Sequence, residues 1–310
     1  MRWLVPLAAL LGLVMACGSD PPFVPTPAAD RDGSSAPIPF SDSRQPFDPG
    51  MLASPASDKS SALPPLVVLD PGHGGAEIGS AEHGLVEKNS NVEMARRVAR
   101  LLETQGIRVL LTRDSDARAA SPPEGVSAFA ATRFDLQARV DMANAAGAAA
   151  FVSIHSNGSP DAGQRGLEVW YDSLRPFASR NLRLAELLLR NTLSELALAG
   201  YQIPNRGLQD DTCFRNFSGR CFQLFVLGPE REVRREELIA RGRDPKDFGL
   251  APGQDFIRTR ATQMPAALIE LLFITNSQDA AILKLEAARD AMARGIAKAV
   301  LDFLAEGYSR

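Results

Sequence analysis

The chain of 310 residues contains three histidines, and two of them stand where an apolar run ends in a turn. His73 follows the apolar run 66–69 and is flanked by glycines, and His155 directly follows the run 149–154. Such runs predict short buried strands, and glycine and proline beside them predict sharp turns. Open α/β folds bind ligands at the carboxyl ends of their strands, so both imidazoles stand where a ligand site is expected.

Two carboxylates complete a set of side chains capable of chemistry. Glu87 follows a glycine-containing loop and precedes a helical pattern. Two histidines and one carboxylate are a known ligand set for a catalytic zinc with an open position for water. Glu270 lies within the apolar run 266–273, where a carboxylate is costly unless it is paired, metal-bound or catalytic. We therefore interpret His73, Glu87 and His155 as metal ligands and Glu270 as a general base.

The elements that must position these residues predict one α/β domain. Apolar runs predict strands at 66–69, 107–111, 149–154, 167–171, 223–227 and 267–273. Helical periodicity predicts a helix that begins near Asn89 and others at 136–146, 180–199 and 287–305. Because strands and helices alternate, we expect a mostly parallel sheet of about six strands, flanked by helices on both faces.

Short motifs follow one another in a fixed order along the same region. They are 70–75 (DPGHGG), Glu87 and Lys88 with Asn91, Thr112 and Arg113 with Asp116, Leu136 with Arg139 and Asn144, 153–157 (SIHSN), 166–168 (GLE), 205–207 (NRG) and 268–276 (LIELLFITN). In this order they resemble the zinc-dependent N-acetylmuramoyl-L-alanine amidases, bacterial cell-wall hydrolases often called the amidase-3 family. The resemblance runs from about residue 66 to residue 303.

The resemblance implies a mixed sheet with one Zn²⁺ per chain at its edge, held by His73, Glu87 and His155. It implies that peptidoglycan is the substrate and that the amide between N-acetylmuramic acid and L-alanine is cut. Zinc-activated water would attack this amide, and Glu270 would take the water's proton and pass it to the leaving amine. Two alternatives stay open, a metallopeptidase of related fold and a catalytically latent cell-wall-binding lipoprotein.

Further residues near the motifs are candidates for supporting roles. Asp70 is a candidate for orienting an imidazole, with turn capping as the alternative. Arg206 is a candidate for binding the carboxylates of the peptide, since arginine suits bidentate recognition, with a structural role as the alternative. Asn157 is a second substrate-binding candidate. His83 matches no family ligand and is interpreted as an exposed loop residue, and Glu77, where the family usually has Asp, is not expected to touch the metal ligands.

The chain begins with the pattern of an export signal. A positive start is followed by an apolar stretch, 4–15, that is too short to span a bilayer. Small residues then lead into Cys17, which resembles the lipobox of bacterial lipoproteins; an ordinary cleaved signal peptide is the alternative. We predict a signal in residues 1–17 and a lipid anchor at Cys17. Because Gly18 follows, the sorting rule of enteric bacteria implies the periplasm-facing outer membrane.

The next segment, residues 18–64, is rich in proline, serine, alanine and aspartate. It has too few large apolar residues to offset its ordering entropy, so it is predicted to be a disordered tether. Such a tether has a reach of roughly 35 to 40 Å. It would let the catalytic domain, predicted at residues 65–310, act at a distance from the anchor.

Two insertions depart from the compact family pattern. Residues 117–134 are rich in proline, alanine and serine and are interpreted as a surface loop, whereas residues 228–263 are highly charged and directly precede the strand of Glu270. Related enzymes can carry an inserted helix that blocks the zinc until a partner protein removes it. A regulatory lid at 228–263 with a protein activator is therefore one hypothesis, and a solvated helical excursion is the alternative.

Cysteine usage and net charge limit the compartment and the partners. Cys213 and Cys221 fall in one loop-like stretch, and an exported domain meets oxidising conditions. A short-loop disulfide between them is therefore favoured, with two free thiols as the alternative. The formal net charge is -3 and no basic stripe is present, so the sequence does not support binding to nucleic acid.

Overall fold

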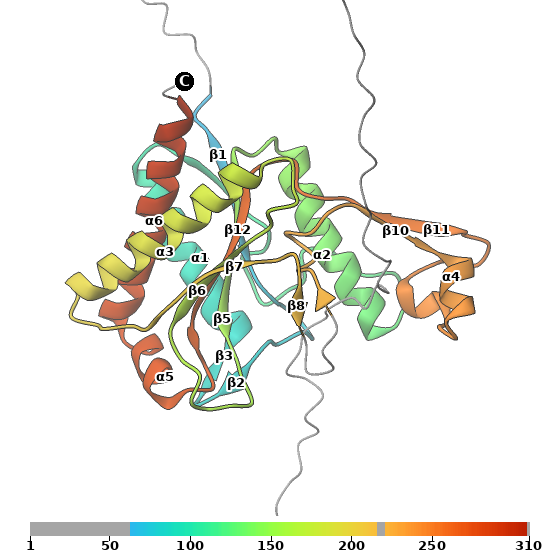
Figure 1. Ribbon diagram of the computed structural model, residues 1–310, viewed down its shortest axis with the longest axis horizontal. Helices are drawn as coiled ribbons and strands as arrows, with labels where there is room; N and C mark the ends of the chain where they lie inside the picture. Colours follow the sequence, from blue (N-terminus) through green and yellow to red (C-terminus); the bar gives the residue numbers. More distant parts are fainter. Residues whose placement is uncertain (1–62, 216–220, 309–310) are drawn as a thin grey trace, which may run out of the picture. The chain divides into compact units, whose positions relative to one another are not determined.

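The computed structural model describes residues 63–215 and 221–308 (Figure 1). The predicted export signal, Cys17 and the tether up to residue 62 lie outside the described residues. None of the helices within the described ranges has the length and apolar character that crossing a membrane would require.

A six-stranded sheet with the strand order β4-β1-β5-β12-β6-β7 forms the centre of the fold. Its strands are β1 (Leu66–Pro71), β4 (Arg108–Leu111), β5 (Ala150–Asn157), β6 (Leu167–Tyr171), β7 (Asn205–Asp210) and β12 (Ala266–Phe273). The strands β4, β1, β5 and β12 are parallel, β6 runs antiparallel to β12, and β7 is parallel to β6. The predicted mixed, mostly parallel sheet is confirmed.

Helices cover both faces of this sheet (Figure 1). One face packs against α1 (Glu87–Thr104), α3 (Ala178–Leu198) and α6 (Glu286–Tyr308), and the other packs against α2 (Ala128–Ala145). Successive residues of a strand alternate between the two faces. Val67 and Leu69 of β1 therefore join the core under α1, while Val68 joins the core under α2. A short helix, α5 (Ser277–Leu283), follows β12.

Two helix starts differ from the sequence prediction. The first helix begins at Glu87 rather than near Asn89, and its N-cap Val86 makes no side-chain cap. A carboxylate in the first turn suits the positive end of the helix dipole. The second helix begins at Ala128, where Ser127 Oγ accepts a 3.1 Å hydrogen bond from the Ala130 backbone N–H. The predicted loop 117–134 therefore ends at this cap.

One predicted strand is wrong and another was missed. Residues 223–227 form no strand but a turn-containing segment, although Val226 and Leu227 are buried in the core under α2. The apolar residues of this segment are buried in the core, but the segment does not pair with a strand. The sixth strand is β7, whose sequence NRGLQD is half exposed at the edge of the sheet and lacks apolar alternation.

Short two-residue strands make up small hairpins beside the main sheet. The strands β2 (Ala81–Glu82) and β3 (Leu85–Val86) pair with each other, as do β8 (Phe214–Arg215) and β9 (Cys221–Phe222). Cys213 is disulfide-bonded. The side chain of Cys221, its predicted partner, lies outside the described residues.

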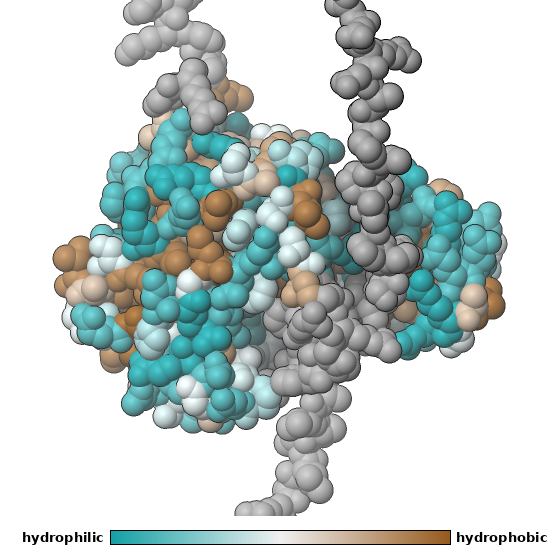
Figure 2. All heavy atoms as spheres, in the orientation of Figure 1, coloured by the Kyte–Doolittle hydropathy of each residue, from teal (hydrophilic) through white to brown (hydrophobic). Residues whose placement is uncertain are grey.

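The charged insertion 228–263 forms a small unit that we call the insertion lobe. It contains β10 (Arg231–Arg234), α4 (Arg235–Ala240), the 3-10 helix η2 (Pro245–Phe248) and β11 (Phe256–Thr259), and β10 pairs antiparallel with β11. Its own apolar cluster is built on Val233, Leu238 and Leu250. The lobe projects to one side in Figure 1, and its visible face is mostly hydrophilic in Figure 2.

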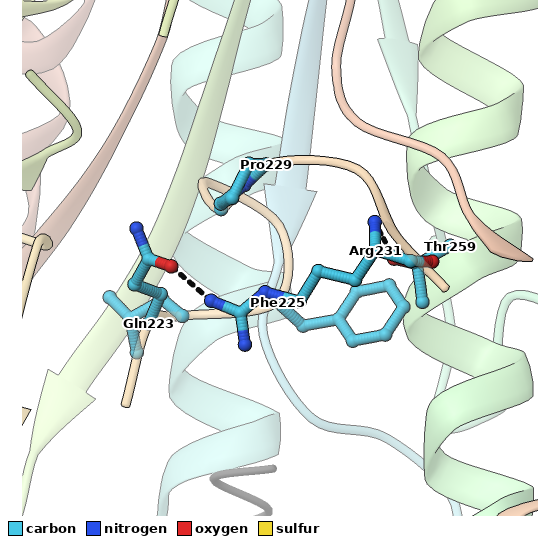
Figure 3. Close-up of a pocket in the computed structure, with 7 residues that line it drawn as sticks. Gln223, Phe225, Pro229, Arg231 and Thr259 are labelled. Carbon is cyan, nitrogen blue, oxygen red and sulfur yellow. Dashed lines mark hydrogen bonds between the residues drawn. The ribbon is translucent and has the colours of Figure 1, made fainter. Parts of the chain in front are cut away.

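Contacts with α2 and the core hold the insertion lobe in place. Phe248 packs edge-on against Phe129 of α2 at a centroid distance of 5.1 Å. Arg175 is buried and donates hydrogen bonds to carbonyl groups at both roots of the lobe, those of Leu227, Gly228 and Thr262. Figure 3 shows Arg231, at the start of β10, directed toward Gln223, with which it forms a hydrogen bond.

Candidate metal centre

His73, Glu87 and His155 meet where β1 and β5 end and α1 begins. One ligand atom from each residue lies within 4.8 Å of the others. His73 Nε2 is 2.8 Å from Glu87 Oε1, and His155 Nδ1 is 3.0 Å from the same oxygen. The structure thus brings together the three residues that the sequence predicted as metal ligands.

Glycines allow these side chains to approach one another. A Cβ at Gly72 would lie 2.1 Å from ring atoms of His155, so the imidazole packs directly on glycine backbone. A Cβ at Gly79 would lie 2.4 Å from Glu87 Oε2, and Gly79 also has a φ of +67°. His73 itself has a φ of 64°, a left-handed conformation that is uncommon for a residue with a side chain. The glycines of the turn after β1 therefore leave room for the side chains of His73, Glu87 and His155, which we call the metal group.

The charged groups of this cluster shift one another's pKa values. Burial lowers the pKa of His73, but the carboxylates of Glu87 and Glu77 outweigh this effect and raise that pKa to about 10. Burial raises the pKa of Glu87, but His73 and His155 outweigh this effect and hold it well below its usual range. Because a metal ligand must be a neutral imidazole, a metal ion at this group binds in competition with a proton on His73.

The donor set fits a zinc ion. Two imidazole nitrogens and one carboxylate oxygen are the protein ligands typical of a catalytic zinc. The backbone N–H of Ser80 donates a 2.8 Å hydrogen bond to Glu87 Oε2, so that the other oxygen of the carboxylate faces both imidazoles. The buried ligand Glu87 is in this way oriented by the protein itself.

A carboxylate that the sequence analysis set aside contacts the first histidine. His73 Nδ1 hydrogen-bonds Glu77 Oε2, so the expectation that Glu77 touches no metal ligand is wrong. Such carboxylate–histidine contacts fix the ring orientation of metal ligands. The sequence offered no signal for this contact, because it depends on an isolated β-bridge between Gly74 and Glu77 that turns Glu77 back toward His73.

Asp70, which was predicted to orient an imidazole, contacts neither ring. Its Oδ1 accepts hydrogen bonds from Thr112 Oγ1 at 2.6 Å and Arg139 Nη1 at 2.9 Å, and its Oδ2 accepts one from Ser153 Oγ at 2.7 Å. Both oxygens therefore face the chain below the turn. Asp70 joins β1 to its neighbours, and the imidazole-orienting carboxylate is Glu77.

Glu270 lies in one row with two other polar residues. In the strand register it stands opposite His155 of β5 on one side and Glu168 of β6 on the other, so the three side chains share a face of the sheet. Its Oε2 atom is covered and has no hydrogen-bond partner within the described ranges. Burial raises the pKa of Glu270 well above its usual range, and the charges of Glu87 and Glu168 add to the effect.

Glu168 forms hydrogen bonds with both predicted substrate-binding residues. Its carboxylate accepts hydrogen bonds from Asn157 Nδ2 at 2.9 Å, from Trp170 Nε1 at 3.3 Å and from Arg206 Nε at 2.7 Å. The Arg206 side chain is 32% exposed, and its guanidinium lies 4.9 Å from the ring centroid of Phe273. The sequence placed Glu168 in a motif but did not identify it as a site residue.

Two other predicted features lie away from the metal group. His83 stands in the turn between β2 and β3, beside Glu82, and does not belong to the cluster. Among the described residues, no hydrogen bond or ion pair joins the insertion lobe to His73, Glu87 or His155. The lobe contacts the flank of α2 instead.

Comparisons with known proteins agree with this arrangement. The family model described as N-acetylmuramoyl-L-alanine amidase matches residues 67–302. The N-acetylmuramoyl-L-alanine amidase LytC of Bacillus subtilis is 25% identical over 238 residues, which is 77% of this chain and 35% of LytC. The germination-specific N-acetylmuramoyl-L-alanine amidase of the same organism is 37% identical over 107 residues, 34% of this chain and 44% of that protein. The chain thus spans less than half the length of these two relatives.

Solved structures show the same fold. The N-acetylmuramoyl-L-alanine amidase AmiC2 of Nostoc punctiforme matches with a TM-score of 0.52 and 28% identity, covering 78% of this chain and 97% of that one. The CwlD amidase of Clostridioides difficile, solved in complex with the GerS lipoprotein, matches with a TM-score of 0.58 and 19% identity, covering 78% and 99%.

Proposed function

Because the chain belongs to the N-acetylmuramoyl-L-alanine amidase family, we propose that it is a peptidoglycan hydrolase. It cleaves the amide bond between N-acetylmuramic acid and the L-alanine of the stem peptide. The observation that carries this proposal is the position of Glu270 on the strand next to His155, opposite it in register, beside the group of His73, Glu87 and His155. An uncompensated carboxylate beside a set of zinc donors is suited to metal-assisted hydrolysis.

Three residues would hold one Zn²⁺, namely His73, Glu87 and His155. Bound there, the ion supplies a Lewis acid that polarises the amide carbonyl and lowers the pKa of water. Glu77 holds His73 Nδ1, which leaves Nε2 facing Glu87. The protein thereby sets the direction of the first imidazole.

Glu270 acts as the general base. It takes the proton of the attacking water and passes it to the nitrogen of the leaving amine. A carboxylate whose pKa is raised by burial holds this proton between the two steps better than an exposed one would. The Oε2 atom of Glu270 has no hydrogen-bond partner within the described ranges, so no described donor of the protein competes for this oxygen.

The network around Glu168 binds the peptide part of the substrate. Arg206 is held by Glu168 on one side and stays partly exposed on the other, where it can meet a carboxylate of the stem peptide. Asn157 lines the same side of the site through its contact with Glu168. Replacement Arg206→Lys is expected to raise KM more than it lowers kcat, and equal effects on both would argue against peptide binding.

The setting of the enzyme is the cell envelope. Cys17 carries a lipid anchor facing the periplasm at the outer membrane, residues 18–64 are the tether, and a protein activator can act on the domain. The lipobox pattern that ends at Cys17 supports the anchor. In labelling with a radioactive fatty acid, the wild type is expected to incorporate label and Cys17→Ser is not; label in both would exclude this anchor.

The experiment that tests the activity uses the purified protein on isolated peptidoglycan. Mass spectrometry would follow free stem peptides that begin with L-alanine, with wild type and Glu270→Ala compared. Release by the wild type, lost with a chelator and restored by Zn²⁺, is expected, and Glu270→Ala should lower the rate by roughly 10² to 10⁴. Fragments cut within the stem would indicate a metallopeptidase, and no release by the wild type would contradict the proposal.

A further inference from the structure

Two motif arginines have no part in metal binding or proton transfer as described above. Arg113 and Arg139 come from separate parts of the chain, the segment after β4 and the helix α2. They are 5% and 0% exposed. Buried arginines are expected to have specific partners, and here these partners converge on the turn that carries His73.

Arg139 donates hydrogen bonds to the backbone carbonyl groups of this turn. Its Nη1 donates a 2.7 Å hydrogen bond to the carbonyl oxygen of Pro71, and its Nη2 donates to that of His73. The charge of Arg139 is balanced by ion pairs with Asp70 at 2.9 Å and Asp135 at 2.8 Å. Asp70 thus acts on the turn through Arg139 rather than through an imidazole.

Arg113 also donates hydrogen bonds to the backbone of this turn. Its Nε donates a 2.9 Å hydrogen bond to the carbonyl oxygen of Pro71, and its Nη2 donates a 2.7 Å hydrogen bond to that of Gly72. The same Nη2 reaches the carbonyl oxygen of Lys88, one residue after the ligand Glu87, at 2.8 Å. Arg113 therefore ties the turn after β1 to the start of α1.

The conformation of the turn explains why its backbone needs these hydrogen bonds. His73 has a left-handed φ of 64°, which is unfavourable for a residue with a side chain and persists where the surroundings over-determine it. Where β1 ends, the carbonyl groups of Pro71 and Gly72 are buried and that of His73 is partly buried, and they need hydrogen-bond donors because an unpaired buried carbonyl is costly. The two guanidinium groups supply these donors.

We propose that Arg113 and Arg139 are positioning residues of the metal centre, acting as an arginine clamp on the backbone of residues 71–73. The clamp holds His73 in its left-handed conformation, with Nδ1 on Glu77 and Nε2 facing Glu87, before a metal ion arrives. This inference rests on the proposed function in that it takes the group to bind Zn²⁺. Lysine cannot replace the clamp, since it lacks the planar fork of donors.

The test is the Zn²⁺ affinity of the full chain, measured by competition with a chelating indicator. Arg113→Lys and Arg139→Lys keep the positive charge but lose the fork. Each is expected to weaken Zn²⁺ binding by about 10-fold or more, the effect typical of losing support around a metal ligand. The matched control is Arg175→Lys, because Arg175 is a buried arginine that binds three carbonyl groups away from the metal group.

A purely structural role would lower the melting temperature of all three variants and leave the Zn²⁺ affinity of the folded protein unchanged. The visible spectrum of the Co²⁺-loaded protein gives a second readout, and a change is expected in the two clamp variants but not in the control. If Arg139→Lys does not fold, Arg113→Lys decides, since it leaves the ion pairs of Arg139 intact. Tight Zn²⁺ binding by wild type and both clamp variants alike would overturn the clamp alone. Absence of Zn²⁺ binding by the wild type would overturn the proposed function too.

Discussion

At the scale of single residues, the positions of the two imidazoles depend on close packing as well as on charge. The ring of His155 packs on the backbone of Gly72, and the Glu87 carboxylate and His73 ring pack on Gly79. Neither contact is visible in the sequence, where these glycines read as ordinary turn residues. The metal ligands therefore depend on residues that carry no chemistry of their own.

Substitution Gly72→Ala is expected to displace the His155 ring. The new Cβ would lie 2.1 Å from ring atoms, and no left-handed φ adds strain at this position. Zn²⁺ affinity measured by calorimetry should fall by about 10-fold or more, as when the support of a metal ligand is lost. Gly163→Ala is the control, because its Cβ would meet an oxygen of exposed Asp161. Unchanged affinity in Gly72→Ala would show that His155 is not a ligand.

The buried carboxyl group of Asp211 makes the free energy of unfolding depend on pH. This residue is 0% exposed, and its carboxylate accepts a hydrogen bond from the Leu224 backbone N–H. Burial raises its pKa to about 8; the charges of Asp172 and Asp210 add to the rise, and the Leu224 hydrogen bond and Arg231 oppose it. Because the folded pKa lies above the unfolded one, the stabilising contribution is full below about pH 4 and is lost as the pH rises toward 8.

The comparison with Asp211→Asn isolates this effect. Asparagine keeps an acceptor for Leu224 but does not titrate, so the variant should gain stability relative to the wild type as the pH rises. The difference in free energy of unfolding should grow by about 1 kcal/mol per pH unit between pH 5 and pH 8. Urea unfolding at both pH values measures it. Parallel pH profiles for the two proteins would exclude a raised pKa at Asp211.

At the scale of elements, the close crossing of α3 and α6 fixes the helical layer on one face of the sheet. Gly295 of α6 faces Thr192 of α3, and a Cβ there would lie 2.4 Å from the Thr192 Cα. The obstacle is backbone, which cannot rotate away as a side chain can. Glycine is tolerated within this helix because it permits the approach.

Replacing Gly295 by alanine is expected to force the two helices apart. Overpacking of this kind costs typically about 1 to 3 kcal/mol of unfolding free energy. Gly307→Ala, near the end of the same helix, is the control, because its Cβ would meet the flexible end of Arg180 at 3.1 Å. Chemical denaturation of both variants measures the difference. Equal stabilities would mean that the crossing is looser than described.

The sequence predicted elements wherever burial and periodicity coincide. Strand β6 was predicted to the residue, because LEVWY is a compact apolar run between breakers. Strand β7 could not be predicted, since an edge strand needs no apolar alternation to pair with β6. The metal group was readable from rare residues at strand ends. Glu77 and Glu168 were not, because their roles arise from a turn and from strand register.

At the scale of the whole molecule, the insertion lobe is an addition to the flank of the domain. It has its own apolar cluster, and its contacts run to α2 through Phe248 and to both roots through Arg175. Among the described residues it makes no hydrogen bond to the metal ligands. This placement favours a surface attachment over a lid that occupies the site.

Deletion of residues 229–261 tests this placement. Gly228 and Thr262 share Arg175 as a donor, so a short glycine–serine linker can join them. Phe129→Ser should accompany the deletion, because losing Phe248 uncovers Phe129. No rise in peptidoglycan hydrolysis is expected relative to the full chain with Phe129→Ser. A clear rise would show that the lobe restrains the site.

The position of β12 makes completion of the sheet depend on a strand that follows both of its neighbours in the chain. It lies between β5 and β6 in the sheet, although both precede it in the chain. Both halves of the sheet precede in the chain the strand that joins them and carries Glu270. A chain that ends before β12 would leave the facing edges of β5 and β6 unpaired, which favours aggregation, and would lack the proposed base. Completion of the sheet and of the proposed catalytic group therefore depends on the same strand.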